Sequence, residues 1–295
     1  MEAERRSDAG SGHVGPSLQG RFQAAADALL TRLMPVQNLE ARQALLRNLA
    51  EIKGGFVVAF VNAHAINMCA RDRSALESFV GADLLLRDGI GAAIGCKAYG
   101  IDPGENMNGT DLIPELLRVL PPKRVALYGT RDPWLSRAAD ALSLMGHEVV
   151  DVQHGFHGRT TYVTRAAAWQ PDVIVLGMGI PKQEILALHL RAEPNLRAFV
   201  LNGGAIIDFI GGRVARAPKF IRFARLEWLF RLMREPRRLL RRYTLDVVAF
   251  LLRILACGVA FRVSHQHARP RGDLAERNLR AGPRSPLLRT PPTHQ

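Results

Sequence analysis

The sequence predicts an α/β fold, in which a parallel, Rossmann-like sheet is flanked by helices and followed by a basic helical C-terminal appendage. Short apolar runs rich in β-branched residues alternate with segments of helical period between residues 56 and 201. Apolar strands that alternate with helices are typical of a parallel sheet covered on both faces. The chain has 295 residues, of which 47% are hydrophobic, enough for one core of roughly 200 residues with further segments attached.

The expected elements follow in order along the chain. Residues 22–51 are predicted to form two short helices, because apolar residues recur there every three to four positions. Strands are then predicted from apolar runs at 56–61, 124–128, 148–152, 173–178 and 198–201. Helices are predicted between them at 65–70, 74–80, 89–98, 110–119, 133–145, 162–169 and 183–191.

Composition divides the chain into four segments. Residues 1–20 are rich in Gly, Ser and Arg and lack the apolar stretch of a secretory signal, so we expect a disordered N-terminus. The α/β core is expected over 21–212, and a basic, membrane-associated helical appendage over 213–261. Residues 262–295 are rich in Pro, Arg and His and are predicted to be a disordered tail.

The positive charge is concentrated in the appendage. The formal net charge of the chain is +13, and residues 213–242 carry eleven Lys or Arg against two Glu, a net +9. This density indicates an anionic partner: phosphate groups, an anionic membrane surface or nucleic acid. Residues 245–261 are strongly apolar but include Asp246 and Arg253, which favours an interfacial or docked amphipathic helix over a membrane span.

Neither disulfide nor metal chemistry is expected. Cys69, Cys96 and Cys257 have no C-x-x-C spacing and are too few for a disulfide framework, which favours a reducing compartment. His154 and His157 are three residues apart, but the intervening Gly155 predicts a turn rather than a metal-binding helix face.

Missing motifs exclude several enzyme classes. No complete G-x-G-x-x-G follows the first strand, and neither a Walker A loop nor a G-x-S-x-G elbow occurs. The chain also lacks the Asp-x-Asp pair with which many sugar transferases hold a divalent ion. A transferase of this sequence would therefore neutralise its leaving group with basic side chains and helix ends.

Three predicted strands end in glycine-bearing turns. Val173 to Leu176 is followed by Gly177, Gly179 and then Pro181, which suits the first position of a helix containing Gln183. The other two turns carry Gly129 and the pair Gly203 and Gly204. Such junctions direct N–H groups at phosphates, so three of them favour a nucleotide-type ligand, although each alone is more often an ordinary βα turn.

Three polar residues precede predicted helices and are candidates for the site. Asn62 follows the first strand, where it could read a substrate hydroxyl or cap the next helix. Asp88 lies between an apolar run and Gly89, where a carboxylate could act as general base or as an N-cap. Asn108 precedes a further helix, for which Thr110 or Asp111 is the expected cap.

The ordered combination of these motifs resembles the bacterial WecG/TagA/CpsF glycosyltransferases, from about residue 22 to about residue 255. The runs that carry the resemblance are Asn62-Ala, Arg87-Asp-Gly-Ile-Gly91, Asn108-Gly-Thr-Asp-Leu112, Gly177-Met-Gly-Ile-Pro-Lys-Gln-Glu184, Asn202-Gly-Gly-Ala-Ile-Ile-Asp-Phe-Ile-Gly211, Arg213-Val-Ala-Arg-Ala-Pro-Lys219, Leu226-Glu-Trp-Leu-Phe-Arg-Leu232 and Glu235-Pro-Arg-Arg238. The chain departs from the family at Asn106, where many members carry Arg, and at Phe60-Val-Asn62, where many carry Thr-Pro-Asn.

The resemblance implies an inverting, metal-independent and cofactor-free enzyme that transfers a sugar from a UDP-sugar to an undecaprenyl-diphosphate-linked saccharide. It implies a peripheral location on the cytoplasmic face of the bacterial inner membrane, in the synthesis of a cell-surface polysaccharide or exopolysaccharide. The catalytic carboxylate falls on Asp88, and Asn62 orders the substrate. The substrate-binding candidates are Asn108, Gly129, Gly177, Gly179, Gln183, Gly203, Gly204, Arg216, Arg222 and Arg225.

Two rival interpretations come from other classes. Charge alone would suit a basic α/β protein that binds nucleic acid, although the ordered motifs disfavour it. A catalytically inert module that docks on membranes is the second rival, and the intact Asp88 argues against it.

Overall fold

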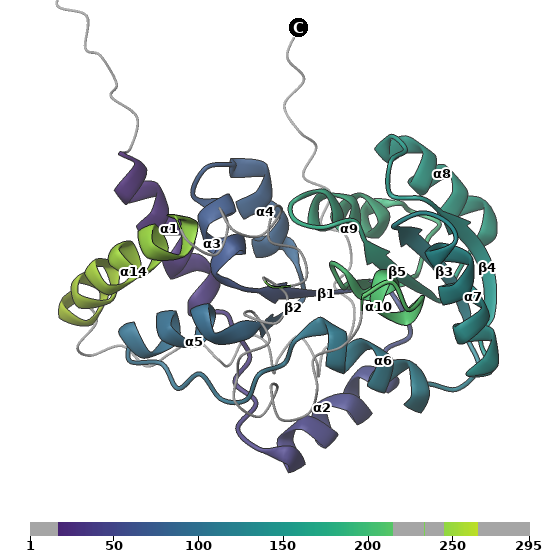
Figure 1. Ribbon diagram of the computed structural model, residues 1–295, viewed down its shortest axis with the longest axis horizontal. Coiled ribbons are helices and arrows are strands. Elements are labelled where there is room, and N and C mark those ends of the chain that lie inside the picture. The colour runs from purple at the N-terminus through teal and green to yellow at the C-terminus, as the bar shows by residue number, and fades with distance from the viewer. Residues whose placement is uncertain (1–16, 215–232, 234–244, 265–295) are drawn as a thin grey trace, which may run out of the picture.

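The computed structural model describes residues 17–214, 233 and 245–264, and it confirms the predicted α/β fold (Figure 1). Six parallel strands form one sheet in the order β2-β1-β6-β5-β3-β4. The strands are β1 (Phe56–Val61), β2 (Leu84–Arg87), β3 (Arg124–Gly129), β4 (Glu148–Gln153), β5 (Val173–Gly177) and β6 (Phe199–Asn202). The helices are α1 (Leu18–Leu30), α2 (Leu39–Ala50), α3 (Ala63–Cys69), α4 (Arg73–Gly81), α5 (Gly89–Ala98), α6 (Gly109–Val119), α7 (Trp134–Leu144), α8 (Arg159–Trp169), α9 (Lys182–Ala192), α10 (Ile206–Ile210) and α14 (Leu245–Ser264).

The two faces of the sheet carry separate hydrophobic layers, because successive side chains of a strand point to opposite faces. On β1, Val57 and Ala59 pack into the layer formed with α1, α3, α4, α5, α8, α9 and α14. Their neighbours Phe56 and Val58 pack into the opposite layer, formed with α2, α6, α7 and α10. Figure 1 shows α4 and α9 above the strands and α2 and α6 below them. Burial on both faces explains why the inner strands are continuously apolar, whereas the edge strand β4 carries exposed polar residues.

Two elements were not predicted from the sequence. Strand β2 has four residues, and a short apolar run of this kind has no period that separates strand from helix. It is a strand because it pairs with β1, with Val58 opposite Leu84 and Val61 opposite Arg87. Helix α10 has five residues and follows the β6 turn, too short for a helical period to be visible.

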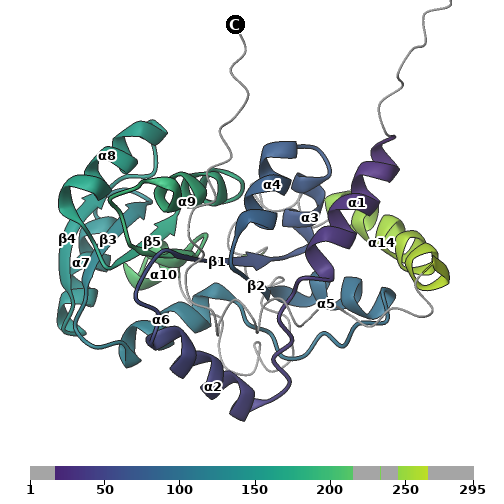
Figure 2. The same cartoon turned by 180° about the vertical axis from the view of Figure 1, so that it is seen from behind.

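The apolar segment predicted at 245–261 forms α14, a helix of 20 residues that docks on α1, α3 and α5 (Figures 1 and 2). One face of it is buried through Phe250, Ile254 and Cys257, and the Phe250 ring lies 6.0 Å from that of Phe22. The opposite face exposes a stripe of aliphatic side chains: Val248, Leu252, Leu255, Val259 and Val263. Asp246–Ser264 is also long and apolar enough to cross a membrane by length and composition, with 22% of the tested window buried.

The docking of α14 changes the expectation for a truncated chain. Composition alone suggests that a core ending at Gly212 would be soluble on its own. The structure instead places Phe250, Ile254 and Cys257 in the same hydrophobic layer as α1 and α3. Removal of α14 would expose that layer, so α14 belongs to the folded core although more than 140 residues separate it from its partners along the chain.

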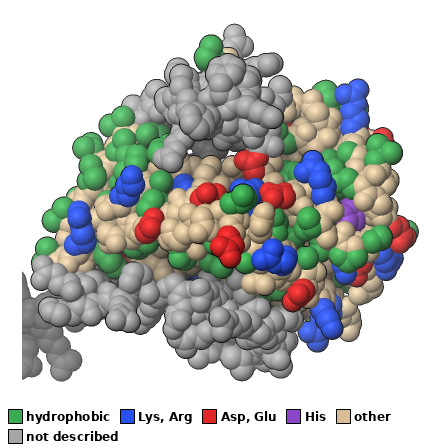
Figure 3. Space-filling model, turned by 90° about the horizontal axis from the view of Figure 1, so that it is seen from below, with side chains coloured by type: hydrophobic (Ala, Val, Ile, Leu, Met, Phe, Trp, Pro, Cys, Tyr) green, Lys and Arg blue, Asp and Glu red, His purple; other side chains and the backbone are tan. Residues whose placement is uncertain are grey.

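The face seen in Figure 3 has no large region of one charge among the residues that the structure describes. Acidic and basic side chains are interspersed there, and hydrophobic side chains gather at the end where α14 lies in Figure 1. The run of eleven basic residues at 213–242 lies almost entirely outside the described residues.

Candidate functional site

The predicted site residues follow the carboxyl ends of the strands, which all meet at one edge of the parallel sheet. Asn62 follows β1, Asp88 follows β2, and Gly203 follows β6. Gly177 and Gly129 end β5 and β3, which are neighbours in the sheet. Ligands of open α/β sheets bind beyond this edge, so the fold brings the candidates to one place although they span more than 140 residues of sequence.

Asn62 and Asp88 are in direct contact. The Asn62 amide nitrogen donates a hydrogen bond to Asp88 Oδ2 at 3.2 Å, and Asn62 Oδ1 accepts one from the Ala65 N–H at 3.0 Å. Asn62 is therefore both the N-cap of α3 and a donor to the carboxylate. Asp88 occupies the N-cap position of α5, but its side chain makes no capping hydrogen bond. Both side chains are half-buried, which leaves the carboxylate accessible.

The turn after Asp88 is held by Asn106 and Arg87, which were not among the predicted site residues. Asn106 Oδ1 accepts a hydrogen bond from the Gly89 N–H at 2.8 Å, so it satisfies the first free donor of α5. The buried Arg87 guanidinium donates to the carbonyl oxygens of Pro103, Gly104 and Gly89 at 2.8 to 3.1 Å. These contacts fasten the turn to the segment that precedes α6.

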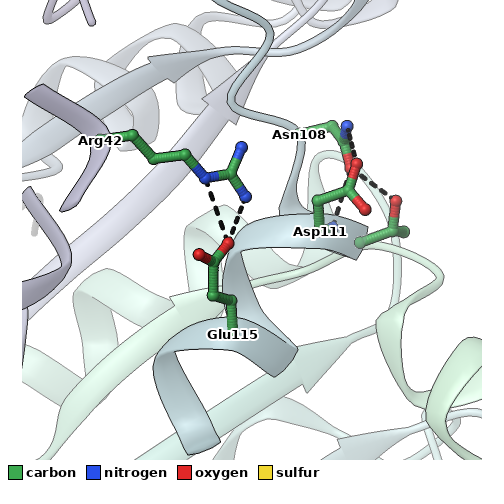
Figure 4. A network of polar contacts seen from close by, with 5 residues as sticks. Arg42, Asn108, Asp111 and Glu115 are labelled. Atoms are coloured by element: carbon green, nitrogen blue, oxygen red, sulfur yellow. Dashed lines mark hydrogen bonds and ion pairs between the residues drawn. The ribbon is translucent and has the colours of Figure 1, made fainter. Parts of the chain in front are cut away.

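Asn108, not Thr110 or Asp111, is the N-cap of α6. Its Oδ1 accepts hydrogen bonds from the Asp111 N–H and the Thr110 hydroxyl, and its amide donates to Asp111 Oδ2 at 2.8 Å. Figure 4 shows this network beside the ion pair between Arg42 of α2 and Glu115 of α6. Asn108 is the cap because its side-chain oxygen lies over the first turn of α6 and accepts hydrogen bonds from it. Its polar atoms are engaged locally, and substrate binding by Asn108 stays a prediction.

The turns after β3 and β5 touch through glycine backbones. A Cβ on Gly129 would lie 2.4 Å from the Gly177 carbonyl oxygen, so only glycine fits there. The loop after β4 joins them, because the Gly155 N–H donates to the Thr130 carbonyl oxygen at 3.0 Å. Lys182 holds the same loop by donating to the carbonyl oxygens of Gly155 and His157.

Gln183 joins the turns after β5 and β6. Its Oε1 accepts hydrogen bonds from the Gly179 N–H at 3.1 Å and the Gly204 N–H at 3.0 Å. The Gly203 N–H donates to the Leu176 carbonyl oxygen. The glycine-bearing turns predict N–H groups that face a phosphate. In the structure, the N–H groups of Gly179, Gly203 and Gly204 instead donate to acceptors within the protein. Pro181 takes the N-cap position of α9, one residue before the first helical position predicted for it.

The next residue, Glu184, is 1% exposed and was not among the predicted site residues. Its Oε1 accepts a hydrogen bond from the Gln183 amide nitrogen at 2.7 Å. Its Oε2 is buried and has no hydrogen-bond partner in the part of the chain that the structure describes. Burial raises the pKa of Glu184 to about 7, because water no longer solvates the charged form.

Arg216, Arg222 and Arg225 lie outside the described residues, so their predicted contacts with a substrate stay predictions. Near the start of that segment Arg213 donates to Asp208, whose carboxylate also accepts the Thr130 hydroxyl. This pairing connects the β3 turn to α10.

The predicted turn at His154 and His157 is present, with the two rings stacked at 3.9 Å. Within the described ranges, no group of three or more His, Cys, Asp or Glu side chains could hold a metal ion.

Comparison with known proteins identifies the same family that the motifs resemble. The model of the glycosyl transferase WecG/TagA/CpsF family matches residues 30–263, which is most of the chain. Curated relatives bear the name N-acetylglucosaminyldiphosphoundecaprenol N-acetyl-beta-D-mannosaminyltransferase. The relative from Bacillus subtilis (strain 168) is 26% identical over 62% of this chain and 73% of its own length. The relative from Bacillus spizizenii is 29% identical over 53% of this chain and 63% of its own length. The relative from Staphylococcus aureus (strain MW2) is 25% identical over 66% of this chain and 78% of its own length.

Among solved structures, a substrate-binding periplasmic protein from Ralstonia solanacearum is 13% identical. The match covers 89% of this chain and 84% of that chain, with a TM-score of 0.28. Overlap this poor carries no conclusion about fold or function.

Proposed function

The chain belongs to the WecG/TagA/CpsF family and is a glycosyltransferase, and from this we propose that it transfers a sugar from a UDP-sugar to an undecaprenyl-diphosphate-linked saccharide. The observation that carries the proposal is the Asp88 carboxylate, oriented by Asn62 and free of any capping role, at the edge of the sheet where ligands bind. The names of the relatives favour N-acetylglucosaminyl-diphosphoundecaprenol as acceptor and an N-acetylmannosamine donor.

The proposed reaction is a single displacement at the anomeric carbon. Asp88 takes the proton of the acceptor hydroxyl, whose oxygen forms the new glycosidic bond as the bond to UDP breaks. Because one nucleophile attacks from the side opposite the leaving group, the anomeric configuration inverts. The Asn62 amide occupies Asp88 Oδ2, so Oδ1 is the atom that accepts the proton.

Departure of UDP requires positive charge around its diphosphate. No Asp-x-Asp pair is available to bind a divalent ion there. We assign this task to Arg216, Arg222 and Arg225 and to the N-terminal end of α9. The turns at Gly179 and Gly204 border open space, because a Cβ at either position would meet no atom within 4 Å. They leave room for the donor on this side of Asp88.

A peripheral location on the cytoplasmic membrane face is part of the proposal. The exposed aliphatic stripe of α14 offers apolar surface, and the basic run at 213–242 precedes it in sequence. Anionic lipid attracts each nearby basic residue by about 1 kcal/mol, so a dense run suffices for binding without a span. This location would bring the site to a lipid-linked acceptor.

The proposal is tested by a donor screen on the full chain. UDP release is measured for a panel of UDP-sugars with a synthetic polyprenyl-diphosphate N-acetylglucosamine acceptor, with and without EDTA. We expect acceptor-dependent release with at least one UDP-N-acetylhexosamine, unchanged by EDTA. Failure of every UDP-sugar would refute the donor class, and an absolute need for Mg²⁺ or Mn²⁺ would refute the metal-independent mechanism.

A further inference from the structure

The carboxamide of Gln183 acts as a clamp between two neighbouring turns of the site edge. One oxygen, Oε1, accepts the N–H groups of Gly179 after β5 and Gly204 after β6. Both glycines have positive φ, 80° and 62°, and neither has a side chain that could hold its turn. Besides the backbone bond from the Gly203 N–H to the Leu176 carbonyl oxygen, the Gln183 side chain therefore ties the two turns together.

The clamp works in only one orientation of the carboxamide. Its oxygen must face the two N–H donors, because the alternative would bring the amide N–H groups against them. Glu184 selects this orientation, because its Oε1 accepts the amide nitrogen of Gln183 at 2.7 Å. Both side chains are buried, with exposed fractions of 3% and 1%, so water does not compete for these bonds.

Burial of the Glu184 carboxyl group is unfavourable for folding. Its second oxygen is buried without a hydrogen-bond partner among the described residues. An apolar side chain of similar volume would avoid the desolvation cost of the carboxyl group. Exchanges of buried charged groups for apolar ones often leave the stability unchanged or raise it. An apolar side chain would fill the position without the bond to Gln183, which the carboxyl group supplies.

We propose that Glu184 is a positioning residue of the transfer reaction, which fixes the Gln183 carboxamide so that the β5 and β6 turns are held in place for the donor. The proposal rests on the function proposed above, because it assigns the open space beside Gly179 and Gly204 to the UDP-sugar. Glu184 touches neither substrate nor reacting atoms and acts through Gln183.

Two substitutions separate positioning from a structural role. Glu184→Gln keeps an oxygen that can accept the Gln183 amide, whereas Glu184→Leu removes every acceptor. Leu190→Met, at a fully buried position two turns along α9, is the matched control for a change in the packing of this helix. Each full-length variant is compared with the wild type at pH 8 by hydrogen exchange over 177–184 and 202–206, by thermal unfolding and by UDP-release kinetics.

We expect Glu184→Leu to speed exchange of the Gly179 and Gly204 amides by about tenfold and to raise the donor KM by a similar factor, which corresponds to the loss of one well-made hydrogen bond. Its Tm should equal or exceed that of the wild type, because a buried carboxyl group is gone. Glu184→Gln and Leu190→Met should resemble the wild type in exchange and in KM.

Three results would overturn the proposal. Unchanged exchange in Glu184→Leu would show that the clamp does not depend on Glu184. Faster exchange with unchanged kinetics would show that the clamp does not serve the reaction. A lowered Tm that accounts for the loss of activity would make Glu184 a structural residue. A wild type that is inactive with every UDP-sugar refutes the proposed function instead, and the exchange measurement still decides the clamp.

Discussion

Replacing Glu184 by glutamine should stabilise the folded protein at pH 8 and leave its stability nearly unchanged at pH 4. The cause is the burial of the carboxyl group, which raises its pKa from an ordinary value of 4.5 to about 7. Below pH 4.5 the group is protonated in both the folded and unfolded chain, and its burial then resembles that of the neutral amide. The nearby Cys69 thiol has a pKa raised by burial and by Glu184, so it stays neutral throughout.

The sign follows from proton linkage. Between pH 4.5 and 7 the folded state binds the proton more tightly than the unfolded state, so wild-type stability falls as the pH rises through this window. Each pKa unit corresponds to about 1.4 kcal/mol. The difference between a pKa of 4.5 and one of about 7 therefore gives a loss of about 3 kcal/mol, complete above pH 7. The glutamine variant does not undergo this loss.

Urea unfolding of the two proteins at intervals from pH 4 to pH 8.5 measures the effect. The two stability curves should coincide at pH 4 and diverge by about 3 kcal/mol at pH 8, equivalent to a Tm difference on the order of 6–12 °C for a domain of this size. Asp140→Asn, which removes an exposed carboxylate on α7, is the control and should give a curve parallel to that of the wild type. Parallel curves for Glu184→Gln would refute the burial argument.

Three further predictions concern the site and the membrane. Asp88→Asn should lower kcat by about 10²–10⁴-fold with unchanged Tm, because it removes the base and keeps the shape; near-normal turnover would exclude Asp88 as the base. Asn62→Ser should keep the α3 cap but lose the amide donor to Asp88, so activity should fall while stability changes by a few tenths of a kcal/mol, whereas Asn62→Ala should also cost about 1 kcal/mol. The double variant Leu252→Glu and Leu255→Glu on the α14 stripe should weaken co-sedimentation with anionic vesicles without unfolding the chain. Leu144→Glu on α7, at a side chain that is 90% exposed, is its control, and equal loss in both would refute docking through α14.

Most of the sheet could be predicted from sequence because burial on both faces makes the inner strands continuous apolar runs. The placement of Asn62 at a strand end followed from the same reasoning, and so did the glycine turns, whereas the strand before Asp88 was not predicted. Their partners could not be predicted. The contact between Asn62 and Asp88 requires β2 to lie beside β1, and the strand order depends on how the crossovers pack rather than on any local pattern.

Long-range contacts also decide the roles of single residues. Gln183 looked like a phosphate-facing residue at a helix start, and only the approach of the β6 turn reveals the bond to Gly204. The apolar run at 245–261, with Asp246 and Arg253, predicted an interfacial or docked amphipathic helix. In the structure α14 is apolar on both faces, and one of them is buried on α1, α3 and α5. The sequence shows the helix, and packing shows which face remains exposed.

Asp88 makes no capping hydrogen bond, and neighbouring side chains hold the turn on which it lies. A carboxylate at the start of a helix normally accepts the free N–H groups there, which would engage the oxygens needed for catalysis. In this chain Asn106 Oδ1 takes the Gly89 N–H, and Arg87 fastens the same turn through three carbonyl oxygens. Within the described residues, the Asp88 carboxylate accepts a hydrogen bond from the Asn62 amide through Oδ2. Because Asn106 carries no charge, the proposed mechanism assigns neutralisation of the diphosphate to other cations, Arg216, Arg222 and Arg225.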